Sequence, residues 1–160
     1  MGTGDASAIP RTGDADLPIC TGNAIMHTPE DLPRVLDAVA ASLRPGGTMS
    51  FESRNPALRE WERWTPQATL TDRDTHLGRL REWLEVTDVD DTGRVVFDAH
   101  NVPPGEQDRV YTSVLYFRTA EELGNQLDAA GFHHITIAGD WDGTPVEEHS
   151  RILLVRAERA

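Results

Sequence analysis

The feature of this sequence that most constrains its fold is a strand–helix–strand pattern in the first third of the chain. A short apolar run at 16–21 is followed by a Thr-Gly-Asn turn, an amphipathic segment at 30–43 and an extended run at 48–54. This order predicts two parallel strands joined by a crossover helix. Because ligands bind at the carboxyl ends of strands in such sheets, we expect functional residues at 21–27 and 52–55.

The segment at 30–43 is predicted to be a helix because its apolar residues recur every three or four positions. Thr28 or Asp31 can cap its first turn, and Pro33 fits within that turn. A Pro-Gly-Gly sequence at 45–47 then ends the helix.

The middle of the chain has a hydrophobic period of two, which is typical of strands. The runs at 81–90, 94–101 and 109–117 are predicted to form an antiparallel meander. The turn at 90–93 (Asp-Asp-Thr-Gly) is a hairpin signal. Before the meander, the pattern at 57–64 predicts a short helix with two Trp on one side.

The last part of the chain again predicts a helix followed by strands. Thr119 and Glu122 have the spacing of a capping box at the start of a helix at 119–130. Two extended runs follow at 133–138 and 151–157. The whole order indicates an α/β fold.

We interpret residues 1–160 as a single domain, because no linker-like segment divides the sequence. Residues 1–14 lack any period and are expected to form a flexible tail. Residues 81–117 would then be an antiparallel insertion in the α/β domain.

The charge of the chain limits its expected partners. The formal net charge is −12, and all 15 basic residues are Arg. Without a basic stripe, nucleic acid and anionic membranes are not expected as partners. The lone Cys20 cannot form an internal disulfide, and neither a signal peptide nor an 18-residue apolar span is found. These features predict a cytoplasmic protein.

The order of these motifs resembles the C-terminal half of class I S-adenosylmethionine (SAM)-dependent methyltransferases. The matching segments are DLPICTGNAIMH, LRPGG, FESRNP and the helix that ends in AAGF. The resemblance implies a partial Rossmann-like methyltransferase sheet in which the four strands of this chain have the order 4-5-7-6. It also implies that the antiparallel meander forms a lid over a small-molecule methyl acceptor.

The resemblance also implies a role for individual residues. The residues expected to contact the cofactor are Asp5, Ala6, Thr21, Gly22 and Asn23. His27 and Glu52 are the candidates for a general base, and the residues expected to face the acceptor are Arg54, Asn55, Trp61 and Trp64. Alternatives stay open: Asn23 can be turn chemistry only, Arg54 can belong to a solvated ion-pair face, and the two Trp can be packing residues.

Two family features are not found in this sequence: the glycine-rich loop after the first strand and the acidic residue that holds the ribose. We therefore expect a truncated methyltransferase that binds SAM weakly and is inactive alone. The alternative is a non-catalytic binding module derived from that fold. Without a neighbouring first strand, the run at 16–21 should lie at a sheet edge and support a homo-oligomer, although Pro18 blunts that edge.

No metal site is expected from the sequence. His76, His100, His133, His134 and His149 do not show metal-ligand spacing. Consecutive residues of a regular strand point to opposite faces, so the pair at 133–134 should not share a metal. Cys20 lies in an apolar run and is interpreted as a small core residue rather than a nucleophile.

Overall fold

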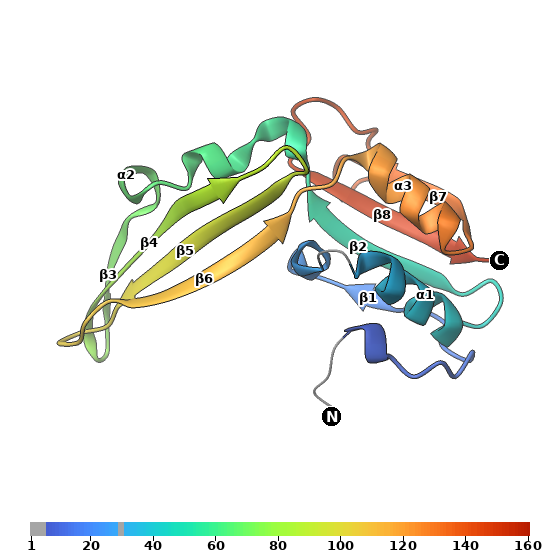
Figure 1. The fold of residues 1–160 in the computed structure, drawn as a ribbon, viewed down its shortest axis with the longest axis horizontal. Coiled ribbons are helices and arrows are strands. Elements are labelled where there is room, and N and C mark those ends of the chain that lie inside the picture. Colours follow the sequence, from blue (N-terminus) through green and yellow to red (C-terminus); the bar gives the residue numbers. More distant parts are fainter. Residues whose placement is uncertain (1–5, 29–30) are drawn as a thin grey trace. The chain divides into compact units, whose positions relative to one another are not determined.

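A computed structural model describes residues 6–28 and 31–160 of the chain, and its fold is drawn in Figure 1. The chain divides into two compact units. One, the α/β unit, contains the residues up to Leu58 together with Phe117–Ala160; the other, the meander unit, is Arg59–Tyr116. The predicted antiparallel insertion therefore forms a compact unit of its own, which begins well before residue 81.

The α/β unit contains a four-stranded sheet of order β1-β2-β8-β7. Its strands are β1 (Ile19–Cys20), β2 (Thr48–Arg54), β7 (Phe132–Ala138) and β8 (Ile152–Arg159). β1 runs parallel to β2, whereas β8 is antiparallel to both β2 and β7. In chain order this is the predicted 4-5-7-6 arrangement, which is therefore confirmed.

β1 is much shorter than the run predicted at 16–21, but it occupies the predicted edge of the described sheet. The carbonyl of Pro18 accepts a hydrogen bond from the Ser50 amide (3.1 Å). Proline has no backbone N–H, but this hydrogen bond to β2 uses only its carbonyl. Leu17 and Ile19 are 53% and 63% exposed. The edge that the sequence predicts is thus apolar and open in the described chain.

Helix α1 (Leu32–Ser42) joins β1 to β2, as predicted, with Pro33 in its first turn. Asp31 is its N-cap residue, but its side chain makes no capping hydrogen bond and pairs with Arg34 instead (3.4 Å). The predicted first position of the helix, residue 30, lies outside the described residues. Residues 6–8 of the predicted tail form a short 3-10 turn, η1 (Ala6–Ala8), which lies against α1.

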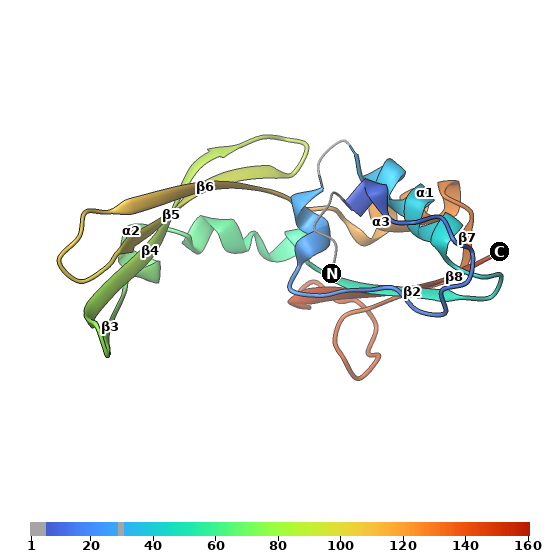
Figure 2. The ribbon, with the colours of Figure 1, turned by 90° about the horizontal axis from the view of Figure 1, so that it is seen from below.

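Helix α3 (Ala120–Ala129) confirms the predicted capping box. The Thr119 hydroxyl accepts from the Glu122 amide (3.1 Å), and the Glu122 carboxylate accepts from the Thr119 amide (2.7 Å). Gly131 ends the helix with φ of +83°, where a side chain would be strained. Figure 2 shows α1 and α3 on the same side of the sheet of the α/β unit. Their buried side chains form one core with those of β2 and β8, including Leu32, Leu36, Leu123, Leu127, Phe51, Leu153 and Val155.

The meander unit is a four-stranded antiparallel sheet of order β3-β4-β5-β6. Its strands are β3 (Thr71–Thr75), β4 (Gly78–Val89), β5 (Arg94–Val102) and β6 (Arg109–Tyr116). The sequence predicted three of these strands and missed β3, because its TDRDT sequence contains no apolar residue. β3 is a strand because β4 supplies its hydrogen bonds.

The hairpin predicted at 90–93 is confirmed between β4 and β5. The Asp90 amide donates to the Arg94 carbonyl (3.1 Å), and the Asp90 carboxylate accepts from the amide of Thr92 (2.9 Å). Gly93 takes the positive φ of +80° that closes such a turn.

The prediction of a single helix at 57–64 is wrong. Two 3-10 turns, η3 (Pro56–Leu58) and η4 (Glu60–Arg63), replace it because Arg59 between them has a φ of +45°. A short α2 (Pro66–Thr69) follows, capped by the Thr65 side chain, which accepts from the Ala68 amide.

The prediction that His133 and His134 point to opposite faces is also wrong. His134 has a φ of +47°, and the register between β7 and β8 shifts after His133, so the strand is bulged there. The two imidazole rings lie on the same side of β7, with centroids 4.4 Å apart. A bulge of this kind cancels the alternation on which the prediction rested.

Candidate functional site

The turn after β1 contains two residues in left-handed backbone conformation. Gly22 has a φ of +70° and Asn23 a φ of +57°, and the chain then enters a 3-10 turn, η2 (Ala24–His27). Gly and Asn are the residues that adopt this conformation at least cost. Among the described residues, no heavy atom outside Gly22 and its two chain neighbours lies within 4 Å of the position where a Cβ of Gly22 would stand, so there is open space beside this turn.

The end of β2 meets this turn through Glu52. Its carboxylate accepts a hydrogen bond from the backbone amide of Asn23 (3.0 Å), and the Glu52 residue is 8% exposed. The structure therefore brings together two residues that the sequence placed at the carboxyl ends of neighbouring strands. The reason is the parallel register, in which Cys20 lies opposite Phe51.

The side-chain oxygen of Asn23 is buried and has no hydrogen-bond partner among the described residues. A buried carbonyl-type oxygen without a donor is costly, by about 1–3 kcal/mol. The open space at Gly22 and this acceptor at Asn23 are the two observations that fit a bound ligand with an N–H or O–H donor.

Cys20 precedes the turn and is half-buried. Burial raises the pKa of its thiol; a backbone hydrogen bond from Ile25 opposes the shift, and the negative charge of Glu52 adds to it. The thiol is thus held in its protonated form at neutral pH, which disfavours a nucleophilic role.

His27 and Arg54 lie near the same end of the sheet but take different positions. His27 is exposed, at the end of η2. The backbone amide of Arg54 donates to the sulfur of Met26 (3.4 Å), which anchors η2 to β2.

Asn55 is buried, and its side-chain amide is engaged within the chain. The nitrogen donates to the carbonyls of Ser150 (2.9 Å) and Glu147 (3.3 Å), and the oxygen accepts from the amide of Ala57 (3.1 Å). Asn55 therefore braces the loop before β8 against the end of β2. Its contact with an acceptor stays a prediction.

Neither a protein-family model nor a curated protein sequence matches this chain. Solved structures do match. A SAM-dependent methyltransferase from Clostridium acetobutylicum superimposes with a TM-score of 0.79 at 15% identity, over 99% of this chain and 64% of that one. This chain has the fold of a class I SAM-dependent methyltransferase.

Other matching structures act on sugars, according to their names. The amino pentose methyltransferase CalS10 from Micromonospora echinaspora, solved with SAM bound, has a TM-score of 0.67 at 17% identity, over 98% of this chain and 63% of that one. The sugar N-methyltransferase KedS8 from a Streptoalloteichus species has a TM-score of 0.68 at 14% identity, over 98% and 60%. The chain thus spans less than two thirds of the length of these structures.

Thr21, Gly22 and Asn23, the residues predicted to contact SAM, form the turn after β1, and their contact with SAM stays a prediction. In the part of the chain that the structure describes, this turn has open space at Gly22 and a buried Asn23 side-chain oxygen without a hydrogen-bond partner. Ala6 is exposed in η1, and Asp5 lies outside the described residues, so their predicted contacts with the adenine ring stay predictions.

Trp61 and Trp64 both line a groove of about 480 Å³ within the meander unit. The Arg59 guanidinium lies 5.9 Å from the centroid of the Trp61 ring. The rings of Trp64 and Phe97 pack in an edge-type arrangement with their centroids 5.0 Å apart. Trp61 is buried and Trp64 is partly buried. Each Trp is therefore both a packing residue and part of a groove wall, so the two interpretations of these residues are compatible.

One residue of this region was missed by sequence reasoning. Arg118 is buried at the start of the α3 segment, and its guanidinium donates to the backbone carbonyl of Thr28. The bond ties the segment after η2 to the residue that precedes the N-cap of α3. A charged residue directly before a capping box carries no sequence signal for such a long-range contact.

No helix in residues 6–28 or 31–160 is both long enough and apolar enough to cross a membrane.

Proposed function

We propose that this chain supplies one wall of the cofactor cleft of a SAM-dependent methyltransferase that acts on a small molecule. The observation that carries the proposal is the junction of Asn23 and Glu52 at the carboxyl ends of two parallel strands, where the buried side-chain oxygen of Asn23 has no hydrogen-bond partner among the described residues. In sheets of this class, ligands bind at this place.

SAM, when bound, supplies an activated methyl group on a sulfonium. The residues of this chain then have three tasks. The open space at Gly22 lets the ligand approach the backbone of the turn closely. The Asn23 side-chain oxygen accepts a hydrogen bond from the ligand. Glu52 fixes the turn by accepting a hydrogen bond from the Asn23 amide. Methyl transfer gains mainly from proximity and from exclusion of water, so positioning residues can carry much of the effect.

For proton transfer, His27 is better suited than Glu52. The Glu52 carboxylate is buried and already accepts a hydrogen bond, whereas His27 is exposed at the end of η2. An exposed imidazole nitrogen can take up a proton from an amine or hydroxyl acceptor, which suits a general base. Glu52 then acts as a positioning residue.

The family's glycine-rich loop and its ribose-binding acid have no counterpart in the described residues 6–28 and 31–160. We therefore propose that these residues bind SAM far more weakly than a methyltransferase domain that has both features, and that they do not catalyse methyl transfer by themselves. Their contribution is the wall around Asn23 and the groove of the meander unit.

The acceptor is proposed to be a small amine-bearing molecule such as an amino sugar. The names of two similar structures support this class. So does the groove, which combines the Trp61 and Trp64 side chains with the carboxylates of Glu62 and Glu85. Aromatic faces cover sugar rings, and carboxylates attract an ammonium group.

The proposal can be tested by titrating SAM into the isotope-labelled chain and following its backbone amide signals. We expect residue-specific shifts at Gly22, Asn23 and Glu52 only at high SAM concentration, with an affinity weaker than about 100 μM, or −5.5 kcal/mol. Asn23→Ala should weaken binding further. The matched control is Asn125→Ala, the same substitution on an exposed position of α3, which should have no effect.

Two outcomes would contradict the proposal in different ways. If the amide signals of these three residues did not shift, the proposed cofactor wall would be contradicted and the non-catalytic binding module would be favoured. Calorimetry that gave micromolar affinity at one-to-one stoichiometry would show instead that the missing loop and acid are not needed.

A further inference from the structure

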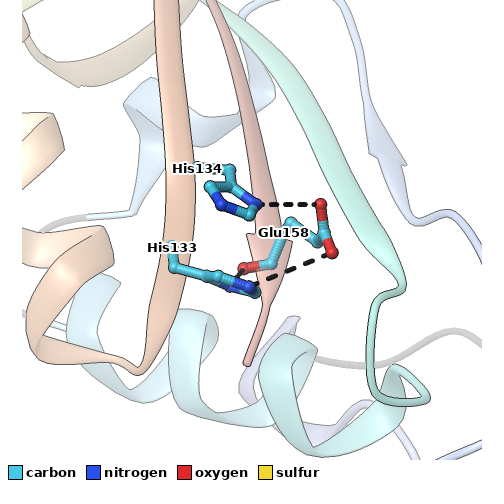
Figure 3. A group of neighbouring side chains, drawn as sticks. All are labelled: His133, His134 and Glu158. Carbon is cyan, nitrogen blue, oxygen red and sulfur yellow. Dashed lines mark hydrogen bonds and ion pairs between the residues drawn. The ribbon is translucent and has the colours of Figure 1, made fainter.

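Three ligand-type side chains converge at the other end of the sheet from the candidate cofactor site. His133 and His134 come from β7 and Glu158 from β8, as Figure 3 shows. Glu158 lies opposite Thr48, the first residue of β2, whereas Glu52 lies opposite Leu154. The cluster of His133, His134 and Glu158, which we call the histidine cluster, is therefore separate from the Asn23–Glu52 junction.

The convergence depends on the bulge in β7. Because His134 adopts a φ of +47°, its ring turns to the same side as that of His133. Cross-strand register places His133 directly opposite Glu158. Non-glycine residues with positive φ are uncommon and carry a local cost, and bulges often aim a side chain at a functional site.

The hydrogen bonds of His133 leave one nitrogen suited to a metal. Its Nδ1 lies 2.8 Å from the backbone carbonyl oxygen of Glu158, and a carbonyl can only accept, so Nδ1 carries the hydrogen. In the neutral ring, Nε2 then has a free lone pair. Metal-binding histidines are held in the same way, with the second nitrogen donating to a carbonyl or carboxylate.

The two carboxylate oxygens of Glu158 each face one ring. Oε1 lies 3.9 Å from Nε2 of His133, and Oε2 lies 3.3 Å from Nδ1 of His134. One ligand atom from each residue lies within 4.8 Å of the others. Neighbouring ligand atoms around a tetrahedral zinc ion are about 3.4 Å apart, given bond lengths near 2.1 Å. Small side-chain rotations would thus complete the spacing.

From this geometry we propose that the histidine cluster binds a first-row transition-metal dication, with Zn²⁺ as the test ion. Zinc accepts imidazole nitrogens together with a carboxylate oxygen, and the two imidazole nitrogens suit it better than Mg²⁺ or Ca²⁺, which prefer oxygen alone. The side chains are 41%, 74% and 38% exposed, so the ion can enter from solvent and keep water at its fourth position. The bound ion would lock β7 to β8.

The test is a calorimetric Zn²⁺ titration of the tag-free, chelator-treated chain, repeated with Co²⁺ to read the coordination geometry from its visible absorption. We expect one ion per chain. His133→Ala and Glu158→Gln should each weaken binding at least tenfold. His134→Asn should do the same while keeping a residue that tolerates positive φ.

Two controls separate this site from other zinc ligands. His149→Ala removes an exposed imidazole that pairs with Glu147 (3.0 Å), and Cys20→Ser removes the thiol. Neither should change the affinity. Zinc should raise the melting temperature of the unmodified chain and of both controls, but not of the three cluster variants.

The proposal would be overturned if millimolar Zn²⁺ did not bind. It would equally be overturned if His133→Ala and Glu158→Gln bound zinc as tightly as the unmodified chain while circular dichroism showed them folded.

Discussion

The α/β unit and the meander unit are each stabilised by a different kind of interaction. Two helices cover the sheet of the α/β unit, and Leu side chains of the helices are fully buried together with Phe51 and Val155 of the strands. In the strands of the meander unit, only Val95 and Leu115 are buried, directly opposite each other on β5 and β6. Much of the rest is exposed and carries ion pairs such as Arg73–Glu82 and Arg94–Asp88.

This difference shows how a sheet that buries few side chains, with only the short helix α2 against β4, can persist. The backbone ladder and short hairpins hold the meander unit, whereas burial of apolar surface stabilises the α/β unit, by about 25 cal/mol per Å². Exposed ion pairs contribute only about 0–1 kcal/mol each. A surface that depends so little on its side chains can change them freely, which is consistent with the acceptor-binding role that we propose for the meander unit.

The comparison predicts the largest mutational effect in the α/β unit. Leu127 of α3 is 0% exposed, so Leu127→Ala should lower the free energy of unfolding by about 2–5 kcal/mol through lost burial and a cavity. Val110→Ala on β6, where the side chain is 48% exposed, should change it by less than about 0.5 kcal/mol. Urea unfolding monitored by circular dichroism measures both. Equal losses of unfolding free energy in the two variants would contradict the difference that we describe between the two units.

A second difference lies in the sheet edges. β3 is an edge strand of the meander unit with exposed Asp72, Arg73 and Asp74, which discourage pairing with another chain. The β1 edge instead exposes Leu17 and Ile19.

We therefore predict self-association through the β1 edge of the described chain. Leu17→Lys should weaken it by roughly tenfold, or about 1.4 kcal/mol, because a buried lysine at the contact opposes pairing. Sedimentation at several protein concentrations is the measurement, and Leu77→Lys, at a 74% exposed leucine of the β3–β4 turn, is the control. A monomer at tens of micromolar that Leu17→Lys leaves unchanged would show that something else covers this edge.

The smallest effect concerns the ion pairs of the meander unit. A hydrogen bond from the Arg79 guanidinium holds the pKa of the Asp72 carboxyl below its ordinary value. Because the folded-state pKa is the lower one, the pair contributes stability at pH values above the unfolded pKa of about 3.9 and loses it as pH falls through the folded value.

Arg79→Met should therefore raise the pKa of Asp72, as measured by following its carboxyl carbon by NMR during an acid titration. The unfolding free energy of the variant should differ from that of the unmodified chain at neutral pH and converge with it at low pH. A pKa of Asp72 that did not move would assign its shift to another group. The control Arg34→Met, at the exposed pair with Asp31 in the α/β unit, should leave Asp72 unaffected.

Local sequence determined those elements whose signals lie within a few residues of one another. The strand at 48–54 was predicted with the bounds that β2 has, and the capping box of α3 and the Asp90–Gly93 turn were confirmed bond by bond. Each of these depends on short-range backbone and side-chain chemistry, which a single segment contains. The order of the four strands of the α/β unit followed from the resemblance of the whole pattern to a known fold.

Tertiary structure alone decided the features that need a partner distant in sequence. β3 has no strand pattern and forms because β4 pairs with it; the Asn23 amide finds Glu52 across 29 positions; and β8 carries Glu158 to a bulged His133–His134 pair. A local pattern cannot report these contacts, because the free energy that stabilises a bulge, a buried carboxylate or a polar strand comes from the neighbour that packs against it.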